Sequence, residues 1–269
     1  MKRWSRGGKE KAVVPESIFG VPLYPHSMRS MEKWCVERIR KRRRGYVCVS
    51  NVHVVTESVL NMALRRALRH AAAVVPDGMP LVWYLRGRGH HGQKRLYGPD
   101  LTLRLVALCR KHGFRVGLFG SEPGTIGAMA TVLRRRFPGV RIAGRASPPY
   151  RRSFTSSDIR AHARIINRWR PDLLFVGLGA PKQEVWMYRA RSLVRAPVMA
   201  GVGAAFDFIA GTKPQAPRWM MRSGLEWSFR LVTEPGRLWR RYVVFNTLFV
   251  IFMILQSVGI IRNAARTRT

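Results

Sequence analysis

The segment from residue 172 to residue 188 constrains the fold of this chain more than any other. Residues 172–176 have the apolar character of a buried strand, and residues 177–180 form a turn that carries two glycines. Pro181 is placed to begin a helix that continues through Trp186 and Tyr188. This order predicts a helix N-terminus at the carboxyl edge of a parallel sheet.

A helix N-terminus at this edge is suited to an anion, because its first backbone N–H groups are unpaired and the helix dipole is positive there. Lys182 and Gln183 add polar groups of the kind that a phosphate or nucleoside uses, and Glu184 follows them. A plain connection between strand and helix, with a solvated Lys-Gln-Glu turn, explains this segment alone equally well.

Strand and helix patterns alternate along most of the chain, which predicts a doubly wound, mostly parallel α/β sheet of the Rossmann-like kind. No GxGxxG fingerprint with a downstream acid is present, so we expect no nicotinamide dinucleotide and no other cofactor. Strands are expected over 17–24, 46–50, 74–75, 115–119, 140–143, 172–176 and 198–202, and helices over 28–43, 56–68, 99–112, 125–136 and 157–168.

The charge balance requires an anionic partner. Forty-nine Lys and Arg residues against fourteen Asp and Glu give a formal charge of +35, while 46% apolar residues exclude a disordered basic tail. Nucleic acid, anionic lipid and phosphorylated substrates fit such a surface. We expect no nucleic acid, because the Arg residues are scattered and no recognition motif interleaves them with aromatics.

Metal chemistry has little support in the sequence. Cys35, Cys48 and Cys109 form no CxxC pair, which fits a reducing compartment and predicts no zinc site. No two Asp residues form an Asp-x-Asp pair, the device that commonly holds a divalent metal on a sugar nucleotide. Arg, Lys and backbone N–H groups must then meet the charge of any bound diphosphate.

Several polar residues and glycines directly follow expected strands, where ligands of such sheets bind. Asp77 lies between Pro76 and Gly78, so a tight turn fixes the direction of its carboxylate, which can act as a general base. Ordinary Asp-Gly turn chemistry is the competing explanation. The other residues at strand ends are Asn51, Gly120, Gly203 and Asp207.

An ordered series of motifs runs through residues 19–242. The motifs are Asn51, Pro76-Asp77-Gly78, Arg95 before Tyr97-Gly98-Pro99-Asp100-Leu101, Leu118-Phe119-Gly120, residues 177–184, Gly201-Val202-Gly203, Phe206-Asp207, Gly224-Leu225-Glu226-Trp227, Arg230, Glu234-Pro235 and Arg237. Together they resemble the WecG/TagA/CpsF family of bacterial glycosyltransferases, and His53 and residues 79–83 resemble its exopolysaccharide-type branch.

The resemblance implies an inverting, metal-independent hexosyltransferase. It would move a sugar from a UDP-sugar to a polyprenyl-diphosphate-linked acceptor in the synthesis of exopolysaccharide or another cell-surface polysaccharide. Asp77 takes the general-base role by position. With the strand-end residues included, the residues expected to bind substrate are Asn51, Arg95, Gly120, Gly179, Lys182, Gln183, Glu184, Gly203, Asp207, Arg230 and Arg237.

Three parts of the chain are expected: a basic flexible arm over 1–16, an α/β core over 17–222 and a C-terminal helical appendage over 223–269. Within the appendage, residues 243–261 are apolar enough to cross a membrane, to lie in its interface, or to form a buried helix. The N-terminus has no signal-peptide pattern. We therefore expect the protein at the cytoplasmic face of the inner (plasma) membrane, peripheral or anchored by this segment.

A non-enzymatic basic protein that binds anionic lipid or nucleic acid is the alternative function. The donor sugar, the acceptor lipid and the oligomeric state, a homo-oligomer included, stay open at this stage.

Overall fold

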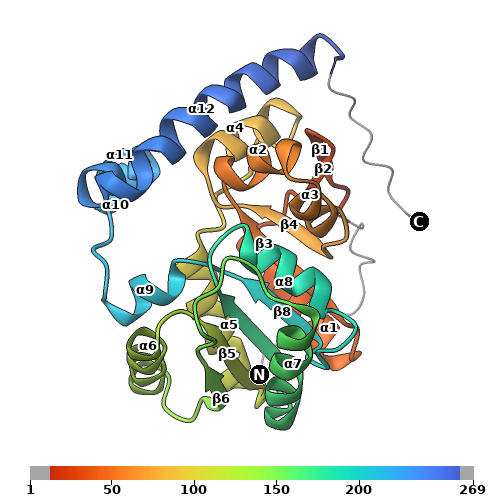
Figure 1. The fold of residues 1–269 in the computed structure, drawn as a ribbon, viewed down its shortest axis with the longest axis vertical. Helices are drawn as coiled ribbons and strands as arrows, with labels where there is room; N and C mark the ends of the chain where they lie inside the picture. Colours follow the sequence, from red (N-terminus) through yellow and green to blue (C-terminus); the bar gives the residue numbers. More distant parts are fainter. Residues whose placement is uncertain (1–12, 261–269) are drawn as a thin grey trace, which may run out of the picture.

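The computed structural model describes residues 13–260, and its centre is a six-stranded sheet in which every neighbouring pair is parallel. This confirms the predicted doubly wound α/β architecture (Figure 1). In spatial order the strands are β4 (Ala73–Pro76), β3 (Gly45–Ser50), β8 (Val198–Gly201), β7 (Leu173–Gly177), β5 (Arg115–Gly120) and β6 (Arg141–Ala146).

Both faces of the sheet are covered, because successive side chains of a strand point to opposite faces. In β3, Tyr46 and Cys48 join one core cluster, and Val47 and Val49 join the other. The helices of the first cluster are α2 (Val52–Leu60), α3 (Met62–Arg69), α4 (Met79–Gly87), α7 (Ser156–Trp169) and α8 (Lys182–Ala190). Those of the second are α1 (Met28–Arg40), α5 (Gly98–His112), α6 (Pro123–Arg136) and α9 (Ala205–Ala210).

The single helix expected over 56–68 is wrong, because two asparagines divide this region. Asn51 begins α2 by accepting a hydrogen bond from the Val54 N–H at 3.3 Å. Asn61 ends α2 and begins α3, where its side chain accepts from the Leu64 N–H at 3.1 Å. Asparagine is among the strongest helix caps, so α2 starts four residues earlier than the expected start at Thr56.

The strand expected over 17–24 is an antiparallel hairpin of β1 (Glu16–Ile18) and β2 (Val21–Leu23). Phe19 and Gly20 form its turn with φ angles of 51° and 78°. Of the arm expected over 1–16, residues 1–12 lie outside the described part of the chain, and Glu16 already begins β1.

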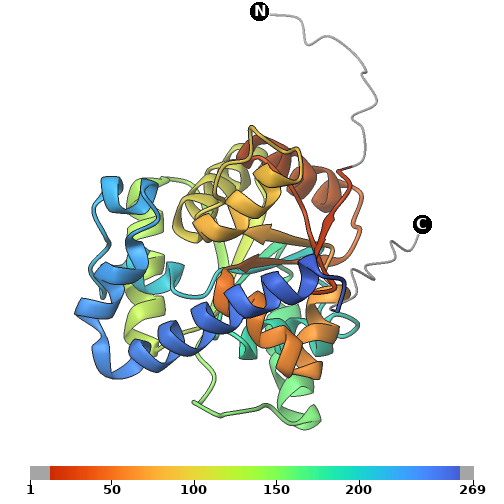
Figure 2. The same ribbon diagram turned by 90° about the horizontal axis from the view of Figure 1, so that it is seen from above.

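The chain ends in three helices, α10 (Arg218–Arg222), α11 (Glu226–Thr233) and α12 (Pro235–Ser257). Figure 2 shows α12 crossing the molecule over α2 and toward the β1–β2 hairpin. The rings of Phe249 and Phe252 meet Phe19 edge-on, with centroids 5.6 and 5.8 Å apart. The Gln256 side chain accepts a hydrogen bond from the Phe19 N–H at 2.7 Å. One side of α12 is therefore packed on the α/β core.

Within residues 13–260, no helix is both long and apolar enough to cross a membrane. The helix α12 covers most of the apolar stretch expected over 243–261, whose last residue lies outside the described part.

Candidate active site

A cavity of about 880 Å³ lies at the carboxyl ends of the parallel strands, where ligands of this fold class bind. It is lined by residues that follow all six strands of the sheet, Ser147 after β6 among them, and by Glu226 and Arg230 of α11. Its strand-end lining includes Asn51 after β3, Asp77 after β4, Ser121 after β5, Gly179 after β7 and Gly203 after β8. The ends of all six strands, which are distant in sequence, thus converge on one site.

Asp77 lies at one side of this cavity and is bound by Arg95. The Asp77 Oδ1 atom is 3.2 Å from Arg95 Nε and 3.1 Å from Arg95 Nη2, and Arg95 Nε also donates to the Asp77 carbonyl oxygen. On its other side, Arg95 Nη1 lies 2.5 Å from the Glu226 carboxylate of α11. The Arg95 guanidinium stacks 4.3 Å from the centre of the Tyr97 ring. The arginine is therefore clamped between two carboxylates and an aromatic ring.

The electrostatics of this cluster favour a base that holds a proton more readily than a solvated aspartate. Burial raises the pKa of Asp77, Arg95 opposes that rise, and the Glu226 carboxylate adds to it. Burial alone would lower the pKa of Arg95, but Asp77 and Glu226 outweigh it and the pKa is raised. Arg95 thus stays charged, while Asp77 moves toward the range in which a general base is effective.

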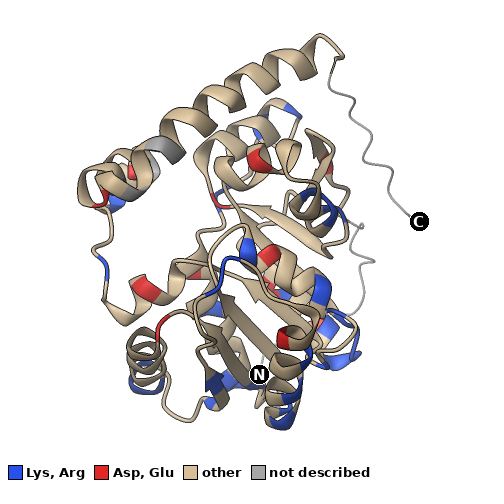
Figure 3. Cartoon of the chain, viewed as in Figure 1, with Lys and Arg blue, Asp and Glu red and all other residues tan. Residues whose placement is uncertain are grey.

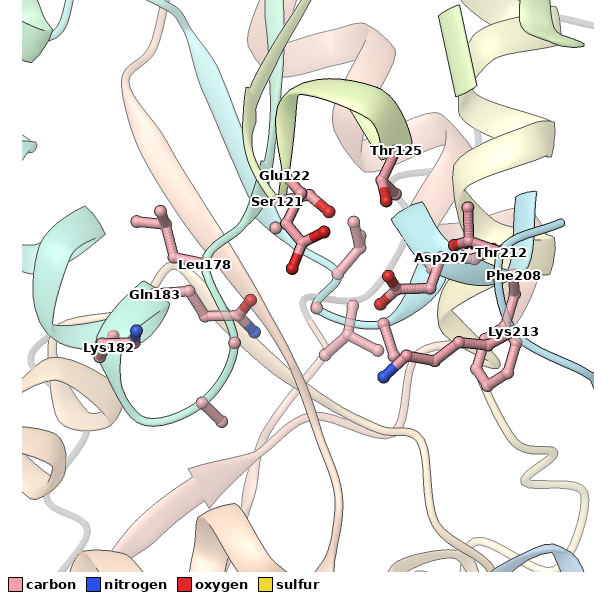
Figure 4. Close-up of a pocket in the computed structure, with 18 of the residues that line it drawn as sticks. Ser121, Glu122, Thr125, Leu178, Lys182, Gln183, Asp207, Phe208, Thr212 and Lys213 are labelled. Carbon is pink, nitrogen blue, oxygen red and sulfur yellow. Dashed lines mark hydrogen bonds between the residues drawn. The ribbon is translucent and has the colours of Figure 1, made fainter. Parts of the chain in front are cut away.

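Gln183 and Glu184 at the start of α8 are both buried, so the alternative of a solvated turn is wrong for these two residues. Gln183 lines the cavity with a side chain only 3% exposed, and its Nε2 donates to Glu184 Oε1 at 2.8 Å. The Gln183 Oε1 atom is buried and has no hydrogen-bond partner within the described residues. In Figure 4 the Gln183 amide points into the cavity. Glu184 is completely buried and does not line the cavity. Its Oε1 atom accepts the hydrogen bond that orients the Gln183 amide.

Two of the predicted glycines differ in what they do. Gly120 has φ of 113°, and a Cβ there would come within 2.7 Å of the Gly177 carbonyl carbon. It lets the ends of β5 and β7 approach each other and does not line the cavity. Gly179 has φ of 78°, lines the cavity and has open space around it, so a ligand can approach its backbone.

The other predicted residues come from separate elements. Asn51 lines the cavity while its side chain caps α2. Lys182 Nζ lies 4.1 Å from the centre of the Tyr150 ring. Asp207 comes from the first turn of α9 and faces the same space as Gln183 in Figure 4. Arg237 belongs to α12, and its side chain lies outside the described part of the structure.

Arg230 reaches the cavity from α11. Its guanidinium lies 5.6 Å from the centre of the Phe208 ring, and its Nε atom is buried without a hydrogen-bond partner among the described residues. Arg95 has carboxylates on both sides, so of these two arginines Arg230 has the greater capacity left, within the described residues, for an anionic ligand.

Comparison with known proteins agrees with this geometry. The family model described as "Glycosyl transferase WecG/TagA/CpsF family" matches residues 16–263, which is nearly the whole chain. The chain belongs to the WecG/TagA/CpsF family. It is therefore a glycosyltransferase, and the non-enzymatic alternative is set aside.

Three curated relatives of this WecG/TagA/CpsF member carry the name N-acetylglucosaminyldiphosphoundecaprenol N-acetyl-beta-D-mannosaminyltransferase. The protein from Bacillus subtilis (strain 168) is 28% identical over 84% of this chain and 86% of its own length. That from Bacillus spizizenii is 31% identical over 75% of this chain and 76% of its own length. That from Staphylococcus aureus (strain NCTC 8325 / PS 47) is 24% identical over 72% and 74% of the two lengths.

Sequence reasoning missed several residues of the cavity. Glu122 and Thr125 lie at the start of α6, and the position of Glu122 two residues after the end of β5 was a usable signal. Glu226 and Lys213 have no such signal, because they follow no strand. Lys213 pairs with Glu234 at 3.0 Å. Only the tertiary fold brings these C-terminal residues to the edge of the sheet.

Proposed function

We propose that this WecG/TagA/CpsF member transfers a hexose-type sugar from a UDP-sugar to a polyprenyl-diphosphate-linked acceptor, with inversion. The pathway would make exopolysaccharide or another cell-surface polysaccharide. The observation that carries the proposal is the mostly buried Asp77 carboxylate, which Arg95 holds at the edge of a cavity of about 880 Å³. That volume is within the range of small-molecule sites.

In this reaction, an acceptor hydroxyl attacks the anomeric carbon of the donor and Asp77 takes the hydroxyl proton. The bond between the anomeric carbon and the diphosphate oxygen breaks, and UDP leaves with its electron pair. A single displacement inverts the anomeric centre and needs one base. The raised pKa of Asp77, caused chiefly by burial, suits that base role.

The donor diphosphate would lie between Arg230 and the start of α8. Arg230 has an unpartnered Nε, and the start of α8 brings Lys182 and the positive end of the helix dipole to the cavity. The buried Gln183 Oε1 atom is suited to accept a hydrogen bond from a donor hydroxyl or a base N–H. Asn51, Gly179, Gly203 and Asp207 complete the lining that the donor would contact.

The acceptor is proposed to reach the site from a membrane surface. Curated relatives are named for an acceptor linked to undecaprenol, which is a lipid. The described residues of α12 carry no Lys, Arg, Asp or Glu after its first turns (Figure 3). Exposed apolar residues of α12 and its C-cap, here called the outer stripe, are Val243, Val244, Val250, Ile251, Ile254 and Val258, each at least 43% exposed.

The outer stripe has the composition of a helix that rests on a bilayer interface, and we propose that this interface is the cytoplasmic face. Large apolar patches on a protein surface mark sites of partner or membrane binding. Trp219, Trp227 and Trp239 in the same C-terminal helices are all exposed, and indole rings favour the headgroup region. The outer stripe and the exposed tryptophans therefore form the surface that we propose faces the membrane holding the lipid-linked acceptor.

The proposed function is tested with a panel of UDP-sugars and a membrane lipid extract as acceptor source, with product mass as readout. We expect one UDP-sugar to add a single sugar residue to a lipid-linked diphosphate acceptor. UDP should also raise the thermal midpoint, and duplex DNA should not. Failure of every UDP-sugar, combined with no stabilisation by UDP, would exclude this function.

Metal independence is a further part of the proposal. In the cavity wall Asp77 and Glu226 are engaged by Arg95, and Arg230 is positioned to meet the diphosphate charge in place of a cation. Within the described residues, no group of three or more His, Cys, Asp or Glu could hold a metal ion. We expect transfer to continue in excess EDTA. Complete loss that Mn²⁺ or Mg²⁺ restores would refute this part.

Membrane docking is tested by co-sedimentation with anionic phospholipid vesicles. Replacing Ile251 and Ile254 by Asp should weaken binding by at least about tenfold, since each loses roughly 1.5 kcal/mol or more of apolar burial. Ile165→Asp is the matched control, because Ile165 is 42% exposed on α7. Equal binding by all variants, or an equal loss in the control, would contradict docking through the outer stripe.

A further inference from the structure

Arg95 is held by two carboxylates that come from distant parts of the chain. Asp77 follows β4 and binds Nε and Nη2, whereas Glu226 begins α11 and lies 2.5 Å from Nη1. All three side chains are mostly buried, with exposed fractions of 16% for Arg95, 22% for Asp77 and 12% for Glu226. Tyr97 covers one face of the guanidinium. Every nitrogen of this arginine is therefore engaged.

We propose that Glu226 is a positioning residue of the transfer site, which holds Arg95 in the orientation that fixes the Asp77 carboxylate. The inference rests on the general-base role proposed for Asp77. It assigns to the C-terminal helices a second task besides carrying Arg230, because Glu226 reaches the site only when α11 is docked.

The geometry explains why one carboxylate is not enough. A guanidinium bound only through Nε and Nη2 can still tilt about its side-chain torsions, and Asp77 would tilt with it. A second contact at Nη1, on the opposite side, removes that freedom. A general base must meet the acceptor hydroxyl within hydrogen-bond reach, and a shift of about 1 Å can cost roughly 10²-fold in rate.

The packing of α12 holds Glu226 in place. α11 is followed directly by α12 and packs against it. α12 is fixed on the core by Phe249 and Phe252 against Phe19, and by the hydrogen bond from the Phe19 N–H to Gln256. The position of Glu226 is therefore a property of the docked C-terminal helices and not of a local turn.

The charges around Asp77 provide a readout that a purely structural role would not move. Burial raises the pKa of Asp77, Arg95 lowers it, Glu226 raises it and Arg230 lowers it. Glu226→Gln removes a negative charge, so the carboxylate form of Asp77 becomes easier to reach. The acid limb of the kcat/KM profile, which reports deprotonation of the base, should therefore move to lower pH.

The experiment measures the pH profile and thermal stabilisation by UDP for the full chain and its variants. Glu226→Gln should lower kcat by about 10- to 100-fold, move the acid limb to lower pH and leave UDP stabilisation intact. Glu226→Asp keeps the charge but shortens the reach, so kcat should fall while the acid limb stays. Glu37→Gln is the matched control, because Glu37 pairs with Lys41 on the surface of α1 and should behave as the parent.

Combination with Asp77→Asn separates this inference from the proposed function. In that background, Glu226→Gln should cost no more than about a further twofold, because the residue it positions no longer acts as a base. The same loss in both backgrounds would overturn the inference and leave the proposed function intact. Parental transfer by Asp77→Asn alone would instead overturn the proposed function.

A folded Glu226→Gln protein with parental kcat and an unmoved acid limb would also overturn the inference. If the Gln variant does not fold, Glu226→Asp decides the matter, because parental kcat in that variant would show that the reach to Arg95 is immaterial.

Discussion

Asp77→Asn is expected to bind UDP like the parent and to lose sugar transfer by about 10²- to 10⁴-fold. The substitution keeps the size of the side chain and its ability to accept a hydrogen bond from Arg95, but removes the basic oxygen. An acceptor hydroxyl is a poor nucleophile at neutral pH, so the loss should appear in kcat and equally in kcat/KM. The measurement is initial rate with the preferred UDP-sugar, beside thermal stabilisation by UDP.

Asp100→Asn is the matched control for this prediction. Asp100 is an exposed acid in the first turn of α5 and does not line the cavity. It should transfer sugar at the parental rate. Near-parental transfer by a folded Asp77→Asn protein would show that another group deprotonates the acceptor, and Asp207 would be the next residue to test.

Arg230→Gln is expected to lower kcat/KM for the donor by about 10- to 100-fold. The proposed diphosphate contact is charge-assisted, and such a hydrogen bond is worth roughly 1.5–3 kcal/mol. Negative charge on the diphosphate grows as UDP leaves, so part of the loss should appear in kcat and part in KM. Steady-state kinetics over a range of donor concentrations separates the two.

The same variant should also change the pH profile in a defined direction. Burial raises the pKa of Asp77 and the positive charge of Arg230 lowers it, so removal of that charge raises the pKa. The acid limb should therefore move to higher pH, opposite to the shift expected for Glu226→Gln. Arg218→Gln, on the exposed surface of α10, is the control for loss of one positive charge from the C-terminal helices. An unchanged kcat/KM in Arg230→Gln would remove Arg230 from the donor site.

Parts of the site that lie at strand ends could be predicted, because they depend on local pattern and on a general property of parallel sheets. A run of apolar residues followed by a glycine or proline turn marks where a strand stops. In doubly wound folds the carboxyl ends of the parallel strands lie at one edge of the sheet, where ligands bind. Asp77, Gly179, Gln183 and Gly203 were predicted in this way, and all four line one cavity.

Other properties depended on contacts between distant segments. Gly120 was expected to bind substrate, but the close approach of β5 and β7 is what requires a glycine there. Arg95 was expected to contact the donor, yet its nitrogens are engaged by Asp77 and Glu226. The helix break at Asn61 was missed because the apolar pattern of a single helix continues across this residue. The Asn61 side chain nevertheless caps a new helix by accepting a hydrogen bond from the Leu64 N–H.

The sequence by itself determined the doubly wound α/β class, the carboxyl edge as the place of the site and the family. These follow from short-range patterns, namely strand and helix periodicity, turn residues and ordered motifs. Tertiary structure alone decided that α12 packs on α2 and Phe19 and that α11 brings Glu226 to Arg95. Apolar periodicity shows that a helix has a face to bury, but the surface that covers this face is chosen by side-chain packing between segments more than 200 residues apart.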